Sequence, residues 1–202
     1  MILCLDNRDS FVFNLVQILR EAGTEVLVLR SDRCSAREVL ARRPKALLLS
    51  PGPGAPGEMG CLLDLAECLP PDLPVLGVCL GHQALASATG LPLRSSLEIV
   101  HGRTSAVHHR GRGLFAGLPT PLELARYHSI EVDAADLEGS PWILEAWIRT
   151  GDRRIVMAMR HSRRPWFGWQ FHPESFLSPA GPRLLRRFLR LALHPEKEAA
   201  AT

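Results

Sequence analysis

The chain has 202 residues, enough for one large domain with its own hydrophobic core, and its hydrophobic fraction of 46% and charged fraction of 22% are those of an ordinary globular protein. Its formal net charge is +3, its arginines are scattered along the chain, and no apolar run approaches the length of a membrane span, so we expect neither a nucleic-acid partner nor a membrane partner. Five cysteines without a Cys-x-x-Cys pair argue against a disulfide framework and a zinc ribbon, and strand-like residues from Ile2 onward leave no room for a signal peptide, which predicts a cytoplasmic protein.

The first ninety residues alternate between strand and helix patterns. Strands are expected at residues 2–5, 26–29, 46–49 and 75–78, and a short helix at residues 35–41. Asp9 or Ser10 can cap a longer helix that ends near Gly23, whose apolar residues recur at helical spacing: Phe11, Leu15, Ile18 and Leu19. Continuous apolar strands separated by helices predict an α/β protein with a mostly parallel central sheet and helices on both faces.

After Gly90 the pattern changes to strands joined by Gly and Pro turns. These strands are expected near residues 98–101, 104–108, 122–126, 142–147, 155–160 and 167–171, and some of them should pair antiparallel at one edge of the sheet. A last helix is expected from Pro182, at its first position, to about Leu191, with arginines on its solvated face. We predict a single domain over residues 1–193 and a polar tail over residues 194–202.

Cys79 lies where an apolar strand passes into a helical stretch of small residues. The glycines Gly77 and Gly81 flank it in a Gly-x-Cys-x-Gly pattern, the thiol counterpart of the Gly-x-Ser-x-Gly nucleophile elbow. A thiol there sits at a helix N-terminus, whose partial positive charge favours the reactive thiolate. The other four cysteines lie in contexts where free cysteine is usually a small core residue. The pattern predicts a nucleophile for acyl transfer, which also needs a base and a site that stabilises the oxyanion.

His172 is the histidine best placed to serve as that base. It follows an apolar segment, and Pro173 favours extended backbone, so that Glu174 falls beside the imidazole two residues on. A carboxylate there would fix the tautomer and favour the imidazolium. Taken alone, the run is more often a strand exit with an incidental carboxylate.

The loop at residues 50–57 combines three prolines with three glycines directly after a strand. Acyl transfer needs backbone donors aimed at a developing oxyanion, and glycine allows the close approach while proline stiffens the loop. Without other clues, such a cluster is simply a turn.

Six segments in the same order resemble the class I, or triad-type, glutamine amidotransferases, and specifically the small glutaminase subunits of anthranilate synthase and aminodeoxychorismate synthase. They are Asp-Asn-Arg-Asp-Ser-Phe at 6–11, Ser-Pro-Gly-Pro-Gly at 50–54, Gly-Val-Cys-Leu-Gly-His-Gln at 77–83, His-Gly-Arg-Thr-Ser at 101–105, Arg-Tyr-His-Ser at 126–129 and Phe-His-Pro-Glu-Ser at 171–175. The resemblance implies a flavodoxin-like core and hydrolysis of L-glutamine to glutamate and ammonia. It also implies a large chorismate-binding synthase subunit as partner, which receives the ammonia and holds any Mg²⁺, with no cofactor or metal in this chain.

The resemblance assigns roles by position. Cys79 would be the nucleophile, His172 the general base and acid, and Glu174 the group that orients it. Two further sets follow: Gly52 and Leu80 as oxyanion donors, and Gly52, Pro53, Gly54, Gln83, Ser129 and Ile130 as residues that hold glutamine. The segment 101–103 would face the partner, or be an ordinary strand end.

Three positions depart from the family pattern: Arg8 stands for the usual tyrosine, Arg103 for lysine and Trp169 for a smaller aliphatic residue. They leave open whether the partner makes anthranilate, aminodeoxychorismate or another aminated product. Two other functions stay open: a catalytically silent regulatory or scaffolding subunit, and a self-sufficient thiol hydrolase or peptidase.

Overall fold

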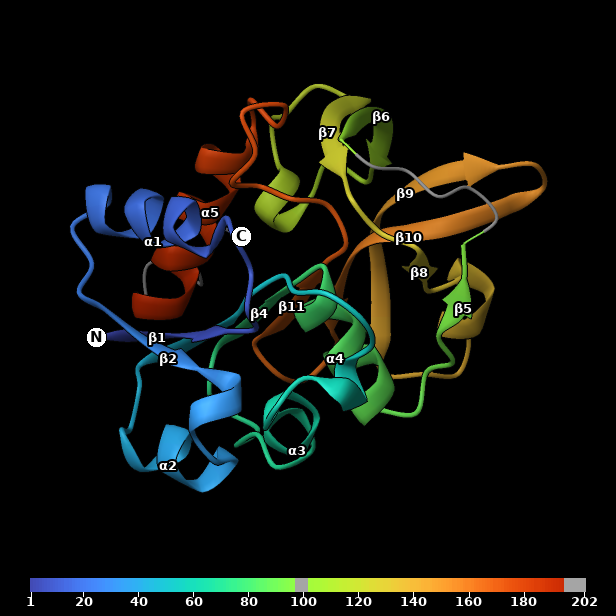
Figure 1. The fold of residues 1–202 in the computed structure, drawn as a ribbon. Helices are drawn as coiled ribbons and strands as arrows, with labels where there is room; N and C mark the ends of the chain where they lie inside the picture. The colour runs from blue at the N-terminus through green and yellow to red at the C-terminus, as the bar shows by residue number, and fades with distance from the viewer. Residues whose placement is uncertain (97–101, 195–202) are drawn as a thin grey trace.

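A mixed nine-stranded sheet forms the centre of the computed structural model, which describes residues 1–96 and 102–194 (Figure 1). The strand order is β2-β1-β3-β4-β11-β10-β9-β6-β7. The strands are β1 (Ile2–Asp6), β2 (Val26–Arg30), β3 (Ala46–Leu49), β4 (Val75–Val78), β6 (Arg103–His109), β7 (Leu122–Arg126), β9 (Trp142–Thr150), β10 (Arg153–His161) and β11 (Trp166–Trp169). The helices are α1 (Val12–Glu21), α2 (Ala36–Ala41), α3 (Leu62–Glu67), α4 (Leu80–Ala88) and α5 (Gly181–Leu193).

The half of the sheet from β2 to β11 is parallel. The strands β1, β3, β4 and β11 are buried on both faces, while the edge strand β2 is only partly buried. In β1, Ile2 and Cys4 join the core under α1 and α5, while Leu3 and Leu5 join the core under α3 and α4. The two helix pairs accordingly lie on opposite sides of the sheet (Figure 1). This alternation explains why the strands read as unbroken apolar runs, and it confirms the predicted parallel sheet with helices on both faces.

The other half, from β10 to β7, is antiparallel. It confirms the predicted antiparallel strands at one edge, although their bounds differ by a few residues. The strand β9 continues to Thr150, β6 and β10 are longer at both ends than expected, and β11 ends at Trp169 instead of residue 171. Beyond Trp169 the pairing with β4 ends: Gln170 N still donates to Met157 O of β10 at 2.9 Å, whereas His172 N donates to Ala125 O of β7 at 3.0 Å. The strand expected at residues 98–101 lies outside the described residues.

Some local predictions were wrong. The first helix begins at Val12 with Phe11 as its N-cap and no side-chain cap, so neither Asp9 nor Ser10 caps it. Arg8 adopts a left-handed φ of 61°, which turns the following residues toward a cleft at the sheet edge. Pro182 is the second residue of α5, one later than expected.

Three short elements had no counterpart in the sequence analysis. Helix α3 spans six residues, and an apolar run so short does not show whether it is helix or strand. The strands β5 (Arg94–Ser95) and β8 (Ile130–Glu131) form a separate two-stranded antiparallel sheet. Within the described residues, no helix has the length and apolar character required to cross a membrane.

The parallel neighbours β3, β4 and β11 end at the same edge of the sheet. β3 leads into the Pro/Gly loop, β4 into Cys79, and β11 into the segment that carries His172. The carboxyl edge of a parallel sheet is where open α/β folds place their ligands. The topology therefore brings together the three segments that the sequence analysis singled out.

Candidate active site

Cys79 forms the tight turn between β4 and α4. Its φ of 50° and ψ of −101° lie in a region that residues with a side chain rarely adopt. A Cβ on Gly77 would collide with the Gly81 backbone, and a Cβ on Gly81 would collide with the Leu49 carbonyl of β3. Both flanking glycines are therefore required by close packing, and the strain at Cys79 is held by the surrounding structure, as is usual at functional sites.

The position of Cys79 is fixed from two sides. Its backbone N–H donates to Trp169 O at 2.7 Å, and its carbonyl accepts from Gln83 N at 3.0 Å in the first turn of α4. The side chain is buried at the helix N-terminus but reaches the cleft at the sheet edge. The sulfur of Cys79 therefore lies at the positive end of the α4 helix dipole and is open to the cleft.

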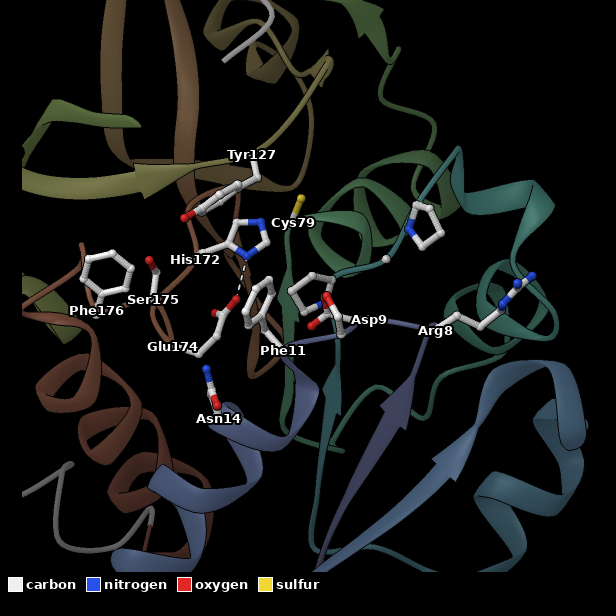
Figure 2. A pocket seen from close by; sticks show the side chains of 14 residues that line it. Arg8, Asp9, Phe11, Asn14, Cys79, Tyr127, His172, Glu174, Ser175 and Phe176 are labelled. Carbon is white, nitrogen blue, oxygen red and sulfur yellow. Dashed lines mark hydrogen bonds and ion pairs between the residues drawn. The ribbon is translucent and has the colours of Figure 1, made fainter. Parts of the chain in front are cut away.

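His172 and Glu174 form a buried pair beside this turn. The His172 Nδ1 atom lies 2.6 Å from Glu174 Oε1, and the other ring nitrogen has no hydrogen-bond partner in the described structure. Figure 2 shows that nitrogen on the side of the imidazole that faces Cys79. Tyr127 packs edge-on against the ring, with centroids 4.9 Å apart at 70°. The imidazole is thus held by a carboxylate on one side and an aromatic ring on its face.

The electrostatics favour a charged imidazole. Burial alone lowers the pKa of His172, but the facing Cys79 and the Glu174 carboxylate outweigh it and hold the pKa well above its ordinary value. A protonated imidazole that faces the sulfur of Cys79 can later give its proton to a leaving group. The arrangement suits nucleophilic attack by sulfur followed by proton delivery to a leaving group.

A cleft of about 480 Å³ opens over these groups. Its walls come from the loop after β1, the loop after β3, Cys79, Tyr127 and the segment after β11 (Figure 2). Asp9 lines it as well, with one carboxylate oxygen buried and without a partner in the described residues. Burial raises the pKa of Asp9 to about 6, and the nearby Glu174 adds to the effect. From the sequence, Asp9 was expected to cap a helix and not to line a cleft, because nothing in the sequence shows that the chain turns at Arg8.

The Pro/Gly loop is clamped to the start of the chain. Ser50 Oγ accepts from Asn7 N at 2.9 Å, and Asn7 Nδ2 donates to Ser50 O at 2.8 Å. A Cβ on Gly52 would strike the Asn7 carbonyl and come within 2.9 Å of Leu80 Cδ2. Leu80 is the first residue of α4, whose leading N–H groups have no partner within the helix. The structure therefore brings the two expected oxyanion residues next to each other, and Gly52 is the one that lines the cleft.

The expected glutamine-binding residues are only partly gathered. Gly52 and Pro53 line the cleft, whereas Gly54, Gln83, Ser129 and Ile130 are not among its lining residues. Gln83 lies behind Cys79, with its amide nitrogen 3.1 Å from the Ile130 carbonyl. Ser129 is exposed, and its carbonyl accepts from Ser96 N. The binding roles of these residues stay predictions.

The three departures occupy different places. Arg8 is exposed on the cleft wall, Arg103 is exposed at the start of β6, and Trp169 is buried and stacked on Phe171 with centroids 5.4 Å apart. Of these three, Arg8 is the one that lines the cleft. No group of His, Cys, Asp or Glu in residues 1–96 and 102–194 could hold a metal ion.

A family model for glutamine amidotransferase class-I matches residues 3–192. Anthranilate synthase component 2 of Thermus thermophilus is 43% identical over 188 residues, which cover 93% of this chain and 91% of that protein. Aminodeoxychorismate synthase component 2 of Escherichia coli is also 43% identical, over 94% of this chain and 99% of its own length.

A solved structure shares the fold at lower sequence identity. It belongs to a putative GMP synthase protein from Thermoplasma acidophilum, with a TM-score of 0.80 and 23% identity, over 98% of this chain and 96% of that one.

Proposed function

Because this chain belongs to the class-I glutamine amidotransferase family, we propose that it is the glutaminase subunit of a chorismate-aminating synthase. The product is anthranilate, as in anthranilate synthase component II, or the aminodeoxychorismate of the folate route, since relatives bearing both names are equally similar. A specialised chorismate-aminating enzyme is a third partner. In each case the large subunit binds chorismate, supplies any Mg²⁺ and receives ammonia from this chain.

The chemistry follows from the three groups at the carboxyl edge. The Cys79 thiolate attacks the side-chain amide carbon of glutamine, and the N–H groups of Gly52 and Leu80 stabilise the oxyanion. The C–N bond then breaks as His172 donates its proton to the departing nitrogen, which leaves as ammonia and a γ-glutamyl thioester at Cys79. Water, deprotonated by the now neutral His172, attacks the thioester. Collapse of the adduct releases glutamate and restores the Cys79 thiolate and the His172 imidazolium. Glu174 orients the ring throughout.

One observation carries the proposal: the buried His172–Glu174 pair, joined at 2.6 Å, shares a cleft with a cysteine held at positive φ at a helix N-terminus. A scaffolding subunit has no need of a strained cysteine or of a buried histidine–carboxylate pair. This arrangement therefore favours an enzyme over a silent subunit.

Replacement of the nucleophile tests the proposal. In the complex with its synthase subunit, Cys79→Ser should abolish glutamine-dependent amination and glutamate release, while amination driven by an ammonium salt continues. Cys68→Ser, at an exposed cysteine outside the cleft, is the matched control and should behave as the wild type. Full glutaminase activity in Cys79→Ser would overturn the assignment.

Two further outcomes separate the alternatives. A glutamine-like chloroketone should label Cys79 selectively, and the absence of labelling would favour a silent subunit. Rapid hydrolysis of γ-glutamyl peptides by the isolated chain would instead indicate an independent thiol hydrolase.

A further inference from the structure

A row of buried polar groups, none of which lines the cleft, leads by hydrogen bonds from Cys79 into the protein. It comprises Gln170, Gln83, the Ile130 carbonyl, His128 and Arg126. All four side chains are buried among the strands and α4. We propose that Gln170, the residue after β11, is a positioning residue whose side-chain N–H group donates to Cys79 Sγ and stabilises it as the anion. This inference rests on the proposed role of Cys79 as nucleophile.

The direction of the Gln170 amide is set by its neighbours. The Ile130 carbonyl can only accept, so Gln83 must present its Nε2 to it, at 3.1 Å. The same nitrogen donates to Gln170 Oε1 at 3.3 Å. With its oxygen engaged, Gln170 must direct its own Nε2 toward Cys79 Sγ, which lies 3.7 Å away. If the Gln83 amide were flipped, its oxygen would face the Ile130 carbonyl oxygen, and if the Gln170 amide were flipped, two NH₂ groups would face each other.

The far end of the row is fixed in the same way. His128 Nδ1, at 3.0 Å from the Ile130 carbonyl, must be the protonated nitrogen. Its Nε2 is then the acceptor for Arg126 Nε at 3.1 Å, and Arg126 Nη1 donates to Ser105 Oγ at 3.0 Å. Burial and the adjacent Arg126 lower the pKa of His128 to about 3. His128 therefore stays neutral near neutral pH, and the donors and acceptors along the row keep the same directions.

Burying two glutamines is costly unless their amides are hydrogen-bonded, and an apolar side chain would fill the position of Gln170 without that requirement. What an apolar side chain cannot do is donate to sulfur. A hydrogen bond to a charged acceptor is stronger than one to a neutral acceptor, so the Gln170 N–H group favours the thiolate over the thiol. Gln170 does not line the cleft, whereas Cys79 does, so this hydrogen bond takes up no part of the cleft wall.

The pH dependence of Cys79 alkylation tests this role. Iodoacetamide reacts with the thiolate, so its rate at Cys79, followed by peptide mass spectrometry, reports how readily the thiol ionises. Gln170→Met removes the donor at similar length, and Gln170→Glu keeps an acceptor for Gln83 but places an oxygen against sulfur. Both should move the alkylation midpoint to higher pH by about one unit, with about a tenfold slower rate at low pH.

The controls separate this inference from the proposed function. Gln17→Met, at an exposed glutamine of α1, should leave the profile unchanged. A merely structural role would lower the melting temperature without moving the midpoint, so an unchanged midpoint in both Gln170 variants overturns the inference. If instead the wild-type protein neither hydrolyses glutamine nor shows an activated Cys79, the proposed function is what fails.

Discussion

Glu174 acts on His172 at short range and away from solvent, because both side chains are buried and their atoms lie 2.6 Å apart. Glu174→Gln keeps a hydrogen-bond acceptor but removes the charge, so the pKa of His172 should fall. The imidazolium would then be lost at lower pH, and the alkaline limb of glutamine hydrolysis should move down in pH. We also expect kcat/KM to fall by about a hundredfold, the scale of general acid–base catalysis. Steady-state kinetics from pH 6 to 10 measure both effects, and an unmoved alkaline limb would contradict the argument.

At Asp9, the protonation state should affect the stability of the fold and not the rate of the reaction. Burial raises the pKa of Asp9 from 3.8 to about 6. Between pH 3.8 and pH 6 the carboxyl is therefore protonated in the folded protein and ionised in the unfolded chain. The stabilisation from the neutral carboxyl is full below pH 3.8 and is lost as pH rises through 6. Asp9→Asn stays neutral at every pH. Its free energy of unfolding relative to wild type should therefore be higher at pH 8 than at pH 5, by about 1 kcal/mol once partial exposure is allowed for.

Urea unfolding at the two pH values measures this difference. Asp136→Asn, at an acidic side chain whose partner is Arg94 on the surface, is a control far from the cleft. If the difference in the free energy of unfolding between Asp9→Asn and wild type does not change with pH, burial does not destabilise the ionised form of Asp9.

In the turn between β4 and α4, a substitution of Gly81 by alanine has two opposing effects on stability. In an ordinary helix Gly→Ala stabilises by about 1 kcal/mol. At Gly81, however, the new Cβ would collide with the Leu49 carbonyl of β3, and overpacking of this kind costs about 1–3 kcal/mol. The steric cost should win, so Gly81→Ala should lower the urea midpoint. Gly57→Ala, whose Cβ would meet Leu63 Cδ2 at an ordinary 3.7 Å, should leave it nearly unchanged. Equal midpoints for the two variants would refute the close-packing argument.

The elements that the sequence predicted are those with a strong local signal. The apolar runs of β1, β3 and β4 revealed a buried parallel sheet, and the alternation of glycines around Cys79 revealed the turn. Helix α3 was missed because six residues carry too little periodicity. The start of α1 was misplaced because the left-handed φ of Arg8 has no marker in the sequence.

In the site, too, only the contacts between residues close in the sequence could be predicted. The His172–Glu174 pair could be predicted because two residues in extended chain point the same way. The row behind Cys79 could not, because Gln83 lies 87 positions from Gln170 and 47 from Ile130. Such contacts depend on how β11, α4 and β8 meet in space, and no local pattern in the chain records them.

On the scale of the whole molecule, the rim of the cleft carries apolar surface that the chain itself leaves uncovered. Phe176 is 90% exposed and Phe11 is 55% exposed, and both line the cleft. Phe13 is 64% exposed but does not line it. Ammonia released at Cys79 must reach the synthase subunit without loss to solvent, so the proposed partner should cover this rim and bury its aromatic side chains.

Phe176→Ala and Phe11→Ala should therefore weaken association with the synthase subunit, each by about tenfold, since a buried aromatic at an interface contributes on the order of 1–2 kcal/mol or more. Phe13→Ala is the matched control, because it removes an exposed ring two residues from Phe11 without touching the cleft. Titration calorimetry with the purified synthase subunit measures the three affinities, and glutamate release by the isolated chain confirms that the site itself is intact. Equal weakening by all three variants would mean that exposed aromatic surface in general, and not the rim of the cleft, holds the partner.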